Sequence, residues 1–562
     1  MLVLTLDTTR PEALSCFGMS ATTTPNLDAL AGEGIAFDRA FAPVPITLPA
    51  HVSLWTGLYP PRHGLRENGQ GVLSPEATTL AELCRDHRYQ TGAFVGAVVL
   101  DPSFGLAQGF DVYDAPKGGR HAGPPGQEDQ EQAAERPARE VVDGALAWLA
   151  RRDPERPFLL WCHFYDPHTP YEAPADLPSS AVDLLSPTLP PEYVREVRGM
   201  DLELGRLLDA LRADGTFART IVVAASDHGE SFGEHGERGH GILCHGATLH
   251  VPLILRLPES WPGDRRVGAR SQAIASLVDV FPTLARVLGW SPGDVDGLDL
   301  LGSIPSDRGV YFESISGYLS YGWSPLSGWL DASGKYVHGT EPAFYDWVSD
   351  PAEAERLSRS DEELGRYRTG MAGVASRPSL SSAGAVDEDL LEDLRGLGYA
   401  ALGSDPSKLP GPLDPTGLPA PETMWELHDE AVRALVLAQQ GSIAEAEPIF
   451  RRVLELNPKN AFVLEQLAIC QVQTGRLPDA AETLGRILRE TAGDHPRIWF
   501  RLGAVLRSQG KLDEAVQALR RADDLAPNRA QYLRELFSAL KDAGKEKEAN
   551  AVGKRLAALT KG

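Results

Sequence analysis

The chain has 562 residues, 42% of them hydrophobic, and a formal net charge of −24 at pH 7. It is too long for a single domain, so we expect two or three, and its apolar content is sufficient for large cores. The strongly acidic balance argues against nucleic acid as a partner. The five cysteines are odd in number and far apart, which argues against a disulfide framework or a zinc knuckle.

The chain begins on an apolar run, Leu2–Leu6, that we interpret as a buried strand ending in Asp7. An aspartate at the carboxyl end of the first strand of an α/β sheet lies where ligands bind, although it could also cap the next element. We find no membrane-spanning stretch and no signal peptide. A chain that starts on a core strand is compatible with missing upstream sequence, so the compartment is left open.

Residues 43–57, PVPITLPAHVSLWTG, place a threonine just before a predicted helix. Thr47 stands in a turn between Pro45 and Pro49, and the run Val52–Trp55 is interpreted as the first turns of the helix. A hydroxyl at a helix N-terminus faces unpaired backbone N–H groups and the positive end of the helix dipole. Thr47 is therefore a candidate for handling an anion.

This segment resembles the sulfatase family of the alkaline phosphatase superfamily. In that family Cys-x-Pro-Ser-Arg and then Ser-Leu-x-Thr-Gly open the helix, and the cysteine is oxidised to formylglycine. Here TLPAH is followed by SLWTG, so Thr47 takes the place of the cysteine. The resemblance implies an α/β fold, an alkaline-phosphatase-like sandwich with a mostly parallel central sheet flanked by helices. It predicts the fold more safely than sulfate chemistry, because no formylglycine can form without the cysteine.

The resemblance also implies a metal site. Asp7 corresponds to the aspartate that binds metal in the family, and a second buried strand, Thr220–Ala225, leads to Asp227 and His228 at the same edge of the sheet. With Thr47, these residues would hold one divalent cation. Carboxylate and imidazole ligands suit Mn, Zn or Mg, with Ca less preferred once a histidine joins.

Three further residues match positions at which the family or its relatives contact the substrate. Asn68 lies 21 residues after Thr47, where related phosphodiesterases and phosphonate esterases have an Asn that donates to the phosphoryl oxygen. His168 precedes Thr-Pro-Tyr in the position of a family His that meets the leaving group, and His240 matches a Lys or His that contacts the anion. An Asn beside Gly is also common in turns, and a loop His is often a plain surface residue.

A second metal is possible, with Asp166, His168 and His240 as its ligands, although Asp166 could equally be a turn residue. We interpret His245 and His250 as structural. Where sulfatases carry Gly-Lys-x-His to grip sulfate, this chain has Gly96-Ala97-Val98-Val99.

These residues favour metal-dependent hydrolysis of a small anionic ester through Thr47. A formylglycine hydrate expels sulfate by reverting to the aldehyde, and threonine has no such route, so phosphate esters are favoured, as diesters or phosphonate esters. The alternatives are a sulfuric ester hydrolase, a transferase that passes the group to an alcohol, and a catalytically quiet scaffold that serves the C-terminal region.

The domain boundaries follow from composition and from the extent of the resemblance. The catalytic domain is expected over residues 1–400, with an exposed insertion at 115–137 and a smaller C-terminal subdomain at about 256–370. A segment dense in Pro and Gly, 401–423, is interpreted as a semi-rigid linker.

Residues 424–560 repeat with a regular period. Gly441, Gly475, Gly510 and Gly544 are spaced 34, 35 and 34 residues apart, and Ala446, Ala480, Ala515 and Ala549 keep the same spacing. This is the tetratricopeptide pattern, in which a small residue joins two helices and an alanine lies where they cross. Such arrays take a peptide or another protein on their concave surface, although the array could instead pack on the enzyme or self-associate.

Overall fold

The computed structural model describes residues 1–19, 22–116, 135–172, 188–382, 409–490 and 495–559, with Leu177 and a few single residues between 384 and 394. Most of the predicted insertion at 115–137, and the first part of the predicted linker at 401–423, lie outside the described residues. The chain divides into two compact units, which are treated separately below. The larger runs from Met1 to Ile315 and resumes at Pro325, and the smaller contains Ser316–Ser324 together with the chain from Gly417 onward.

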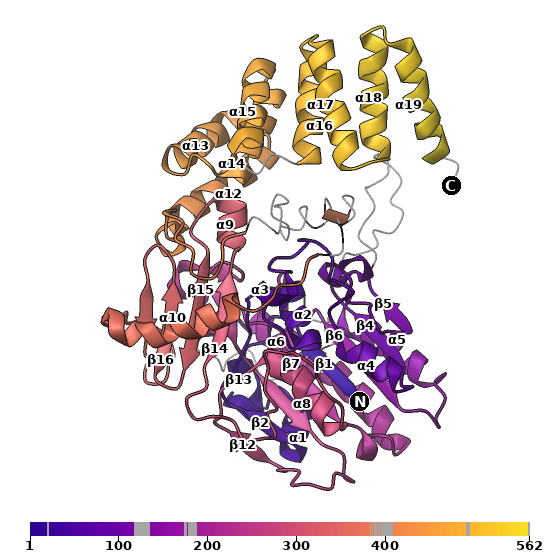
Figure 1. Cartoon of the computed structure of the whole chain (residues 1–562), viewed down its shortest axis with the longest axis vertical. Coiled ribbons are helices and arrows are strands. Elements are labelled where there is room, and N and C mark those ends of the chain that lie inside the picture. Colours follow the sequence, from indigo (N-terminus) through magenta and orange to yellow (C-terminus); the bar gives the residue numbers. More distant parts are fainter. Residues whose placement is uncertain are drawn as a thin grey trace. The chain divides into compact units, whose positions relative to one another are not determined.

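An eight-stranded sheet forms the centre of the larger unit (Figure 1). Its order is β12-β2-β11-β7-β1-β6-β4-β5, and only β11 runs antiparallel to its neighbours. The strands are β1 (Leu2–Leu6), β2 (Ile35–Phe37), β4 (Gln90–Val95), β5 (Val112–Asp114), β6 (Phe158–Phe164), β7 (Val222–Ser226), β11 (Leu253–Arg256) and β12 (Ala269–Ser271). The central strands β1, β6 and β7 are buried along their whole length, as their runs of apolar residues require. The predicted α/β sandwich with a mostly parallel sheet is confirmed.

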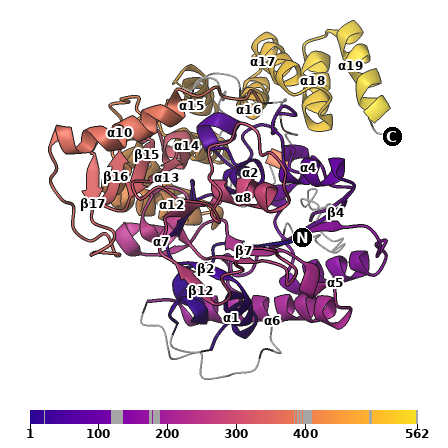
Figure 2. The same ribbon diagram turned by 60° about the horizontal axis from the view of Figure 1, so that its bottom comes forward.

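Helices cover both faces of this sheet, as Figure 2 shows. One face carries α1 (Pro25–Glu33), α5 (Ala138–Leu149) and α6 (Pro191–Ala213), and the other carries α2 (Thr47–Thr56), α4 (Leu80–Asp86) and α8 (Val280–Val287). On α6 the buried apolar residues recur every three or four positions, as Val194, Val197, Met200, Leu204, Leu207, Leu208 and Leu211. This stripe joins the residues of β1 and β6 in one core.

A second, antiparallel sheet completes the larger unit. It contains β14 (Val310–Ser314), β15 (Leu326–Asp331), β16 (Gly334–His338) and β17 (Ala343–Tyr345) in that order. Helix α10 (Asp361–Ala375) packs against β15, and Tyr311, Tyr336 and Tyr367 lie in the shared core. The C-terminal end of β14 contacts loops of the candidate site.

The smaller unit is built of helix pairs (Figure 1). Its helices are α12 (Trp425–Gln439), α13 (Ile443–Leu456), α14 (Ala461–Gln473), α15 (Leu477–Glu490), α16 (Pro496–Ser508), α17 (Leu512–Leu525), α18 (Ala530–Asp542) and α19 (Glu546–Leu559). The four periodic glycines have φ between 69° and 83°, the left-handed conformation that glycine adopts after a helix end. The four periodic alanines are all fully buried. The predicted all-helical repeat region is confirmed.

One segment of the smaller unit comes from an unexpected part of the chain. The connection between β14 and β15 contains helix α9 (Ser316–Tyr321), which packs against α14. Tyr321 stacks on Trp323, and the two rings contact Trp425, His428 and Phe462 edge-on. The Asn457 side chain also donates to the Tyr321 carbonyl. These aromatic residues fill the start of the repeat array. No helix in the described part of the chain is long and apolar enough to cross a membrane.

Candidate metal centre and active site

The site is built on the carboxyl ends of three neighbouring strands. β1 lies between β6 and β7, and Leu6 is in register with Phe164 on one side and Ser226 on the other. Asp7 and Asp227 therefore leave the sheet side by side, and the Asp7 N–H donates to the Phe164 carbonyl at 2.9 Å. The Ser226 hydroxyl donates to the Leu6 carbonyl and fixes the two strand ends together.

Asp7, Asp227 and His228 converge as expected of metal ligands. One ligand atom from each lies within 4.8 Å of the others, and all three side chains are fully buried. Both oxygens of Asp7 and Oδ2 of Asp227 have no hydrogen-bond partner in the described structure. Burial raises the pKa of both carboxyl groups well above the usual range, and each would take up a proton unless a cation neutralised it. This donor set fits a divalent cation.

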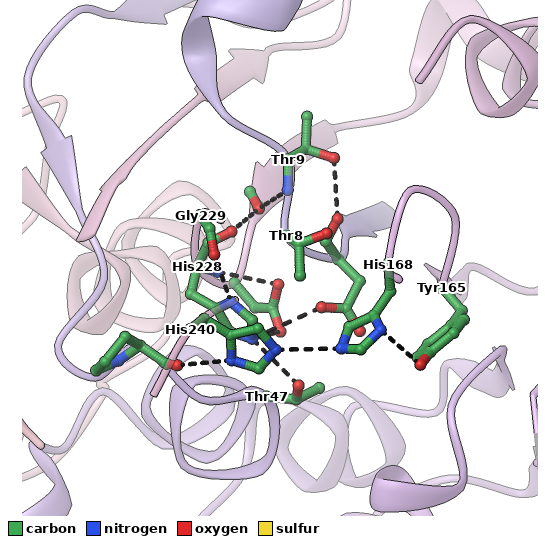
Figure 3. Close-up of polar contacts among 12 residues, drawn as sticks. Thr8, Thr9, Thr47, Tyr165, His168, His228, Gly229 and His240 are labelled. Atoms are coloured by element: carbon green, nitrogen blue, oxygen red, sulfur yellow. Dashed lines mark hydrogen bonds and ion pairs between the residues drawn. The ribbon is translucent and has the colours of Figure 1, made fainter. Parts of the chain in front are cut away.

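The imidazole of His228 is held in one tautomer (Figure 3). Nδ1 lies 3.0 Å from the Gly229 carbonyl and donates to it, so Nε2 carries the lone pair. Nε2 lies 3.6 Å from Asp7 Oδ1 and 3.5 Å from Asp227 Oδ2. Burial, with His240 nearby, lowers the pKa of His228 well below its usual value, so the ring is neutral and suited to ligation.

Thr47 is the first residue of α2. The sequence had suggested that the helix begins near Val52, and that prediction is wrong. Proline is tolerated in the first turn, where its missing N–H costs no hydrogen bond, so Pro49 does not delay the helix. The Thr47 hydroxyl lies 3.2 Å from Nε2 of His228 and is almost completely buried. The hydroxyl therefore lies at the positive end of α2 and beside the carboxylate pair.

Asn68 lies beside the start of α2. Its Oδ1 accepts a hydrogen bond of 2.9 Å from the Leu48 N–H, which joins the loop of Asn68 to the first turn of the helix. Its Nδ2 makes no hydrogen bond within the described residues, and the side chain is buried. The geometry leaves this amide group available to donate to a ligand next to Thr47.

His168 and His240 form a pair on the open side of the His228 ring (Figure 3). Their Nε2 atoms are 3.1 Å apart. His240 Nδ1 donates to the Pro45 carbonyl at 3.1 Å, and His168 Nδ1 donates to the Thr169 carbonyl at 2.7 Å and lies 2.7 Å from the Tyr165 hydroxyl. Burial lowers the pKa of His168 to about 3 and that of His240 to about 4. Both neutral rings hold their one hydrogen at Nδ1, so a hydrogen between the two Nε2 atoms requires one ring to take up a proton.

The remaining sequence candidates lie elsewhere. Asp166 Oδ2 accepts from the N–H of Ala138 at the start of α5, a capping role. His245 binds Glu353 Oε2 at 2.7 Å, and His250 Nε2 donates to the Asp38 carbonyl at 2.9 Å, as expected of structural histidines. Within the described residues, Asp166 therefore does not join His168 and His240.

Two buried histidines at the site were not anticipated. Nε2 of His163 lies 3.4 Å from Asp7 Oδ2, and Nδ1 of His51 lies 3.6 Å from Asp227 Oδ2. Thr5 Oγ1 accepts from the Trp161 indole at 2.9 Å and lies 3.0 Å from His163 Nδ1, which fixes the position of the ring beside Asp7. The one sequence signal was a histidine inside the otherwise apolar run of β6.

Comparison with known proteins agrees with this architecture. The family model "Sulfatase" matches residues 1–290, and two tetratricopeptide repeat models match residues 437–506 and 496–529. Steryl-sulfatase of Mus musculus is 27% identical over 405 residues, which cover 52% of this chain and 63% of that protein. An arylsulfatase of Clostridium perfringens is 24% identical over 64% of this chain and 90% of its own length.

Solved structures show the same fold. The phosphonate monoester hydrolase of Agrobacterium radiobacter superposes with a TM-score of 0.52 at 23% identity, over 66% of this chain and 94% of that one. The sulfatase model alone covers more than half of the present chain. The chain therefore belongs to the sulfatase family of the alkaline phosphatase superfamily, whose members bind a divalent metal, and its C-terminal region consists of tetratricopeptide repeats.

Proposed function

We propose that this hydrolase cleaves phosphate esters, preferentially diesters or phosphonate esters, with Thr47 as its nucleophile and Asp7, Asp227 and His228 as metal ligands. The observation that carries the proposal is the Thr47 hydroxyl, 3.2 Å from Nε2 of His228 and beside two buried carboxylates, of which both oxygens of Asp7 and Oδ2 of Asp227 lack a hydrogen-bond partner in the described structure. When bound there, a divalent cation would lower the pKa of the hydroxyl and neutralise charge on the phosphoryl oxygens. Whether the cation is Mn, Zn, Mg or Ca is left to the experiment.

The other steps of the proposed reaction are assigned to side chains of the protein. After the Thr47 hydroxyl loses its proton to solvent, Oγ1 forms a bond to phosphorus as the bond to the leaving oxygen breaks. A proton taken up from solvent between Nε2 of His168 and Nε2 of His240 would be placed to move to that oxygen, and the Asn68 amide would donate to a phosphoryl oxygen. Water then cleaves the bond between Oγ1 and phosphorus and restores Thr47.

The charge of the site favours a substrate with a single negative charge at phosphorus. Among the described residues that hydrogen-bond to Thr47, Asn68 or His240, none is a lysine or an arginine. The buried Arg10 and Arg66 in neighbouring segments are paired with Glu234 and Glu313. Two carboxylates and one divalent cation sum to zero, which suits a phosphodiester or phosphonate monoester monoanion better than a dianion.

The residues specific to sulfate chemistry are replaced. Ala97 and Val99, which stand where sulfatases keep cations, are buried apolar residues. Thr47 cannot release sulfate as a formylglycine hydrate does, so a sulfated threonine would have to be hydrolysed at sulfur. This chemical argument supports phosphoryl transfer, and hydrolysis of sulfate esters or transfer to an alcohol are the alternatives.

A panel of aryl phosphate monoesters, diesters, phosphonates and sulfates, assayed with each metal in turn, tests the proposal. His168→Ala should slow esters of poor leaving groups more than those of good ones, because only poor leaving groups need a proton in the transition state. An equal loss on both classes would contradict the assigned proton transfer. For the repeats, we propose a protein or peptide partner, as is usual for such arrays.

A further inference from the structure

The C-terminal end of β14 contacts the three loops that carry Thr47, Asn68 and His240, although β14 itself carries no proposed substrate-side residue. The backbone N–H of Glu313 donates to the Pro43 carbonyl at 2.9 Å, four residues before Thr47. The next residue, Ser314, donates its hydroxyl to the carbonyl of Gly241, which follows His240. Two of the three loops are thus attached to consecutive residues of one strand.

The side chain of Glu313 reaches the third loop. Arg66, two residues before Asn68, donates to Oε1 from Nε and to Oε2 from Nη2, both at 2.7 Å. The Tyr311 hydroxyl adds a hydrogen bond of 2.6 Å to Oε2. Glu313 is fully buried and Arg66 nearly so, so this is a bidentate ion pair held away from water.

The segment that leads into Thr47 is also joined directly to the other two loops. Asn68 accepts from the Leu48 N–H, and His240 donates to the Pro45 carbonyl. A displacement of one loop would therefore pass to the others. By contrast, Asp7 and Asp227 are fixed by the strand ends of β1 and β7, and in the described part of the chain no hydrogen bond joins them to β14.

We propose that Glu313 is a positioning residue for the reaction, which acts through Arg66 and the end of β14 to align Thr47, Asn68 and His240. This inference rests on the proposed function, since it concerns the residues that contact the substrate there. Burial lowers the pKa of Arg66 but the Glu313 carboxylate outweighs it, so the guanidinium is charged and needs its partner. Without that partner, Arg66 would be a buried cation that has lost its bidentate counter-charge and would draw the loop of Asn68 toward solvent.

The full-length Glu313→Gln variant tests this. We expect kcat for an aryl phosphodiester to fall by roughly 10- to 100-fold with KM changed little, because small misplacements of reacting groups have effects of this size. Binding of Mn²⁺ alone, measured by calorimetry, should keep its affinity because the metal ligands do not depend on β14. The Arg66→Met variant should lose the same factor, and the double variant no more than either single one, because both act through one contact.

Asp279→Asn is the matched control. Asp279 forms a comparable buried pair with Arg308 but none of its hydrogen bonds reaches the three loops. It should lower the midpoint of unfolding while kcat stays near that of the wild type. Activity of Glu313→Gln within twofold of the wild type, or a parallel loss in Asp279→Asn, would overturn the proposal.

Two further measurements keep the proposal testable. If Glu313→Gln does not fold, Tyr311→Phe and Ser314→Ala each remove one hydroxyl from the same network and should each lower kcat several-fold with Mn²⁺ affinity unchanged; full activity in both would refute the role of β14. If the wild type turns over no phosphate ester, the proposed function fails, and the positioning role is then measured by vanadate binding to the Mn²⁺-loaded protein. Glu313→Gln should weaken vanadate binding by about tenfold or more. Equal affinity of the variant and the wild type for vanadate would reject the positioning role.

Discussion

Replacing Asp7 with asparagine should stabilise the metal-free protein and abolish its response to metal. The ligand atoms of Asp7 and Asp227 lie within 4.8 Å, and at an effective dielectric constant of about 20 two unit charges at that distance repel by about 3 kcal/mol. The metal-free protein either bears this repulsion or takes up a proton against the aqueous pKa, at a comparable cost. Asparagine has nearly the same shape and no charge, so Asp7→Asn should raise the free energy of unfolding in chelator by about 2–3 kcal/mol.

In the presence of metal, the wild type should gain stability relative to Asp7→Asn. A cation at a concentration of about 100 times its dissociation constant stabilises the wild type by about 2.7 kcal/mol, and Asp7→Asn should lose most of that gain. Urea unfolding of the larger unit, followed by fluorescence with and without chelator, measures both effects. Asp201→Asn is the control, because Asp201 is equally buried but accepts hydrogen bonds from Asn26 and Leu27 at the start of α1. It should lose stability equally in both conditions, and destabilisation of metal-free Asp7→Asn would refute the reasoning.

Two further predictions concern stability. Burial lowers the pKa of His63 from 6.5 to about 3, so the unfolded state binds more protons and stability falls as the pH drops from 6.5 toward 3. His63→Gln should remove about 2 kcal/mol of this loss at about pH 5. The urea midpoint of the variant should therefore depend less steeply on pH than that of the wild type. An unchanged dependence would show that His63 is not the source of the loss. Trp323 is 1% exposed in the smaller unit, so Trp323→Ala should cost the repeat helices about 3–5 kcal/mol by thermal melting in circular dichroism. A repeat transition that is unaffected would show that α9 does not stabilise the array.

The sequence alone predicted two features: the site residues at the ends of apolar strands, and the helical region in which residue types recur at a fixed spacing. Asp7 and the pair Asp227–His228 each follow an apolar run of strand length, and parallel strands bring such ends to one edge of the sheet. The repeats follow from glycines and alanines at fixed spacing. In both cases the signal lies within one segment or in its exact recurrence, so no long-range contact had to be known.

The contacts that the sequence did not reveal are all between distant segments. The position of His163 beside Asp7 depends on the register of β6 against β1, and the pairing of Arg66 with Glu313 joins residues 247 positions apart. The packing of α9 in the repeat unit likewise joins Tyr321 to Phe462. Such contacts depend on packing in three dimensions, for which a single sequence carries no local signal.

The most direct test of the account compares an aryl phosphodiester with an aryl sulfate as substrates of the wild type, Thr47→Ser and Thr47→Ala. We predict that the wild type hydrolyses the phosphodiester faster than the sulfate in the presence of metal. Thr47→Ser should keep measurable activity because it keeps the hydroxyl, and Thr47→Ala should lose on the order of 10³-fold or more, the scale of a removed nucleophile. A wild type that prefers the aryl sulfate, or a Thr47→Ala variant with full activity, would contradict the proposed mechanism.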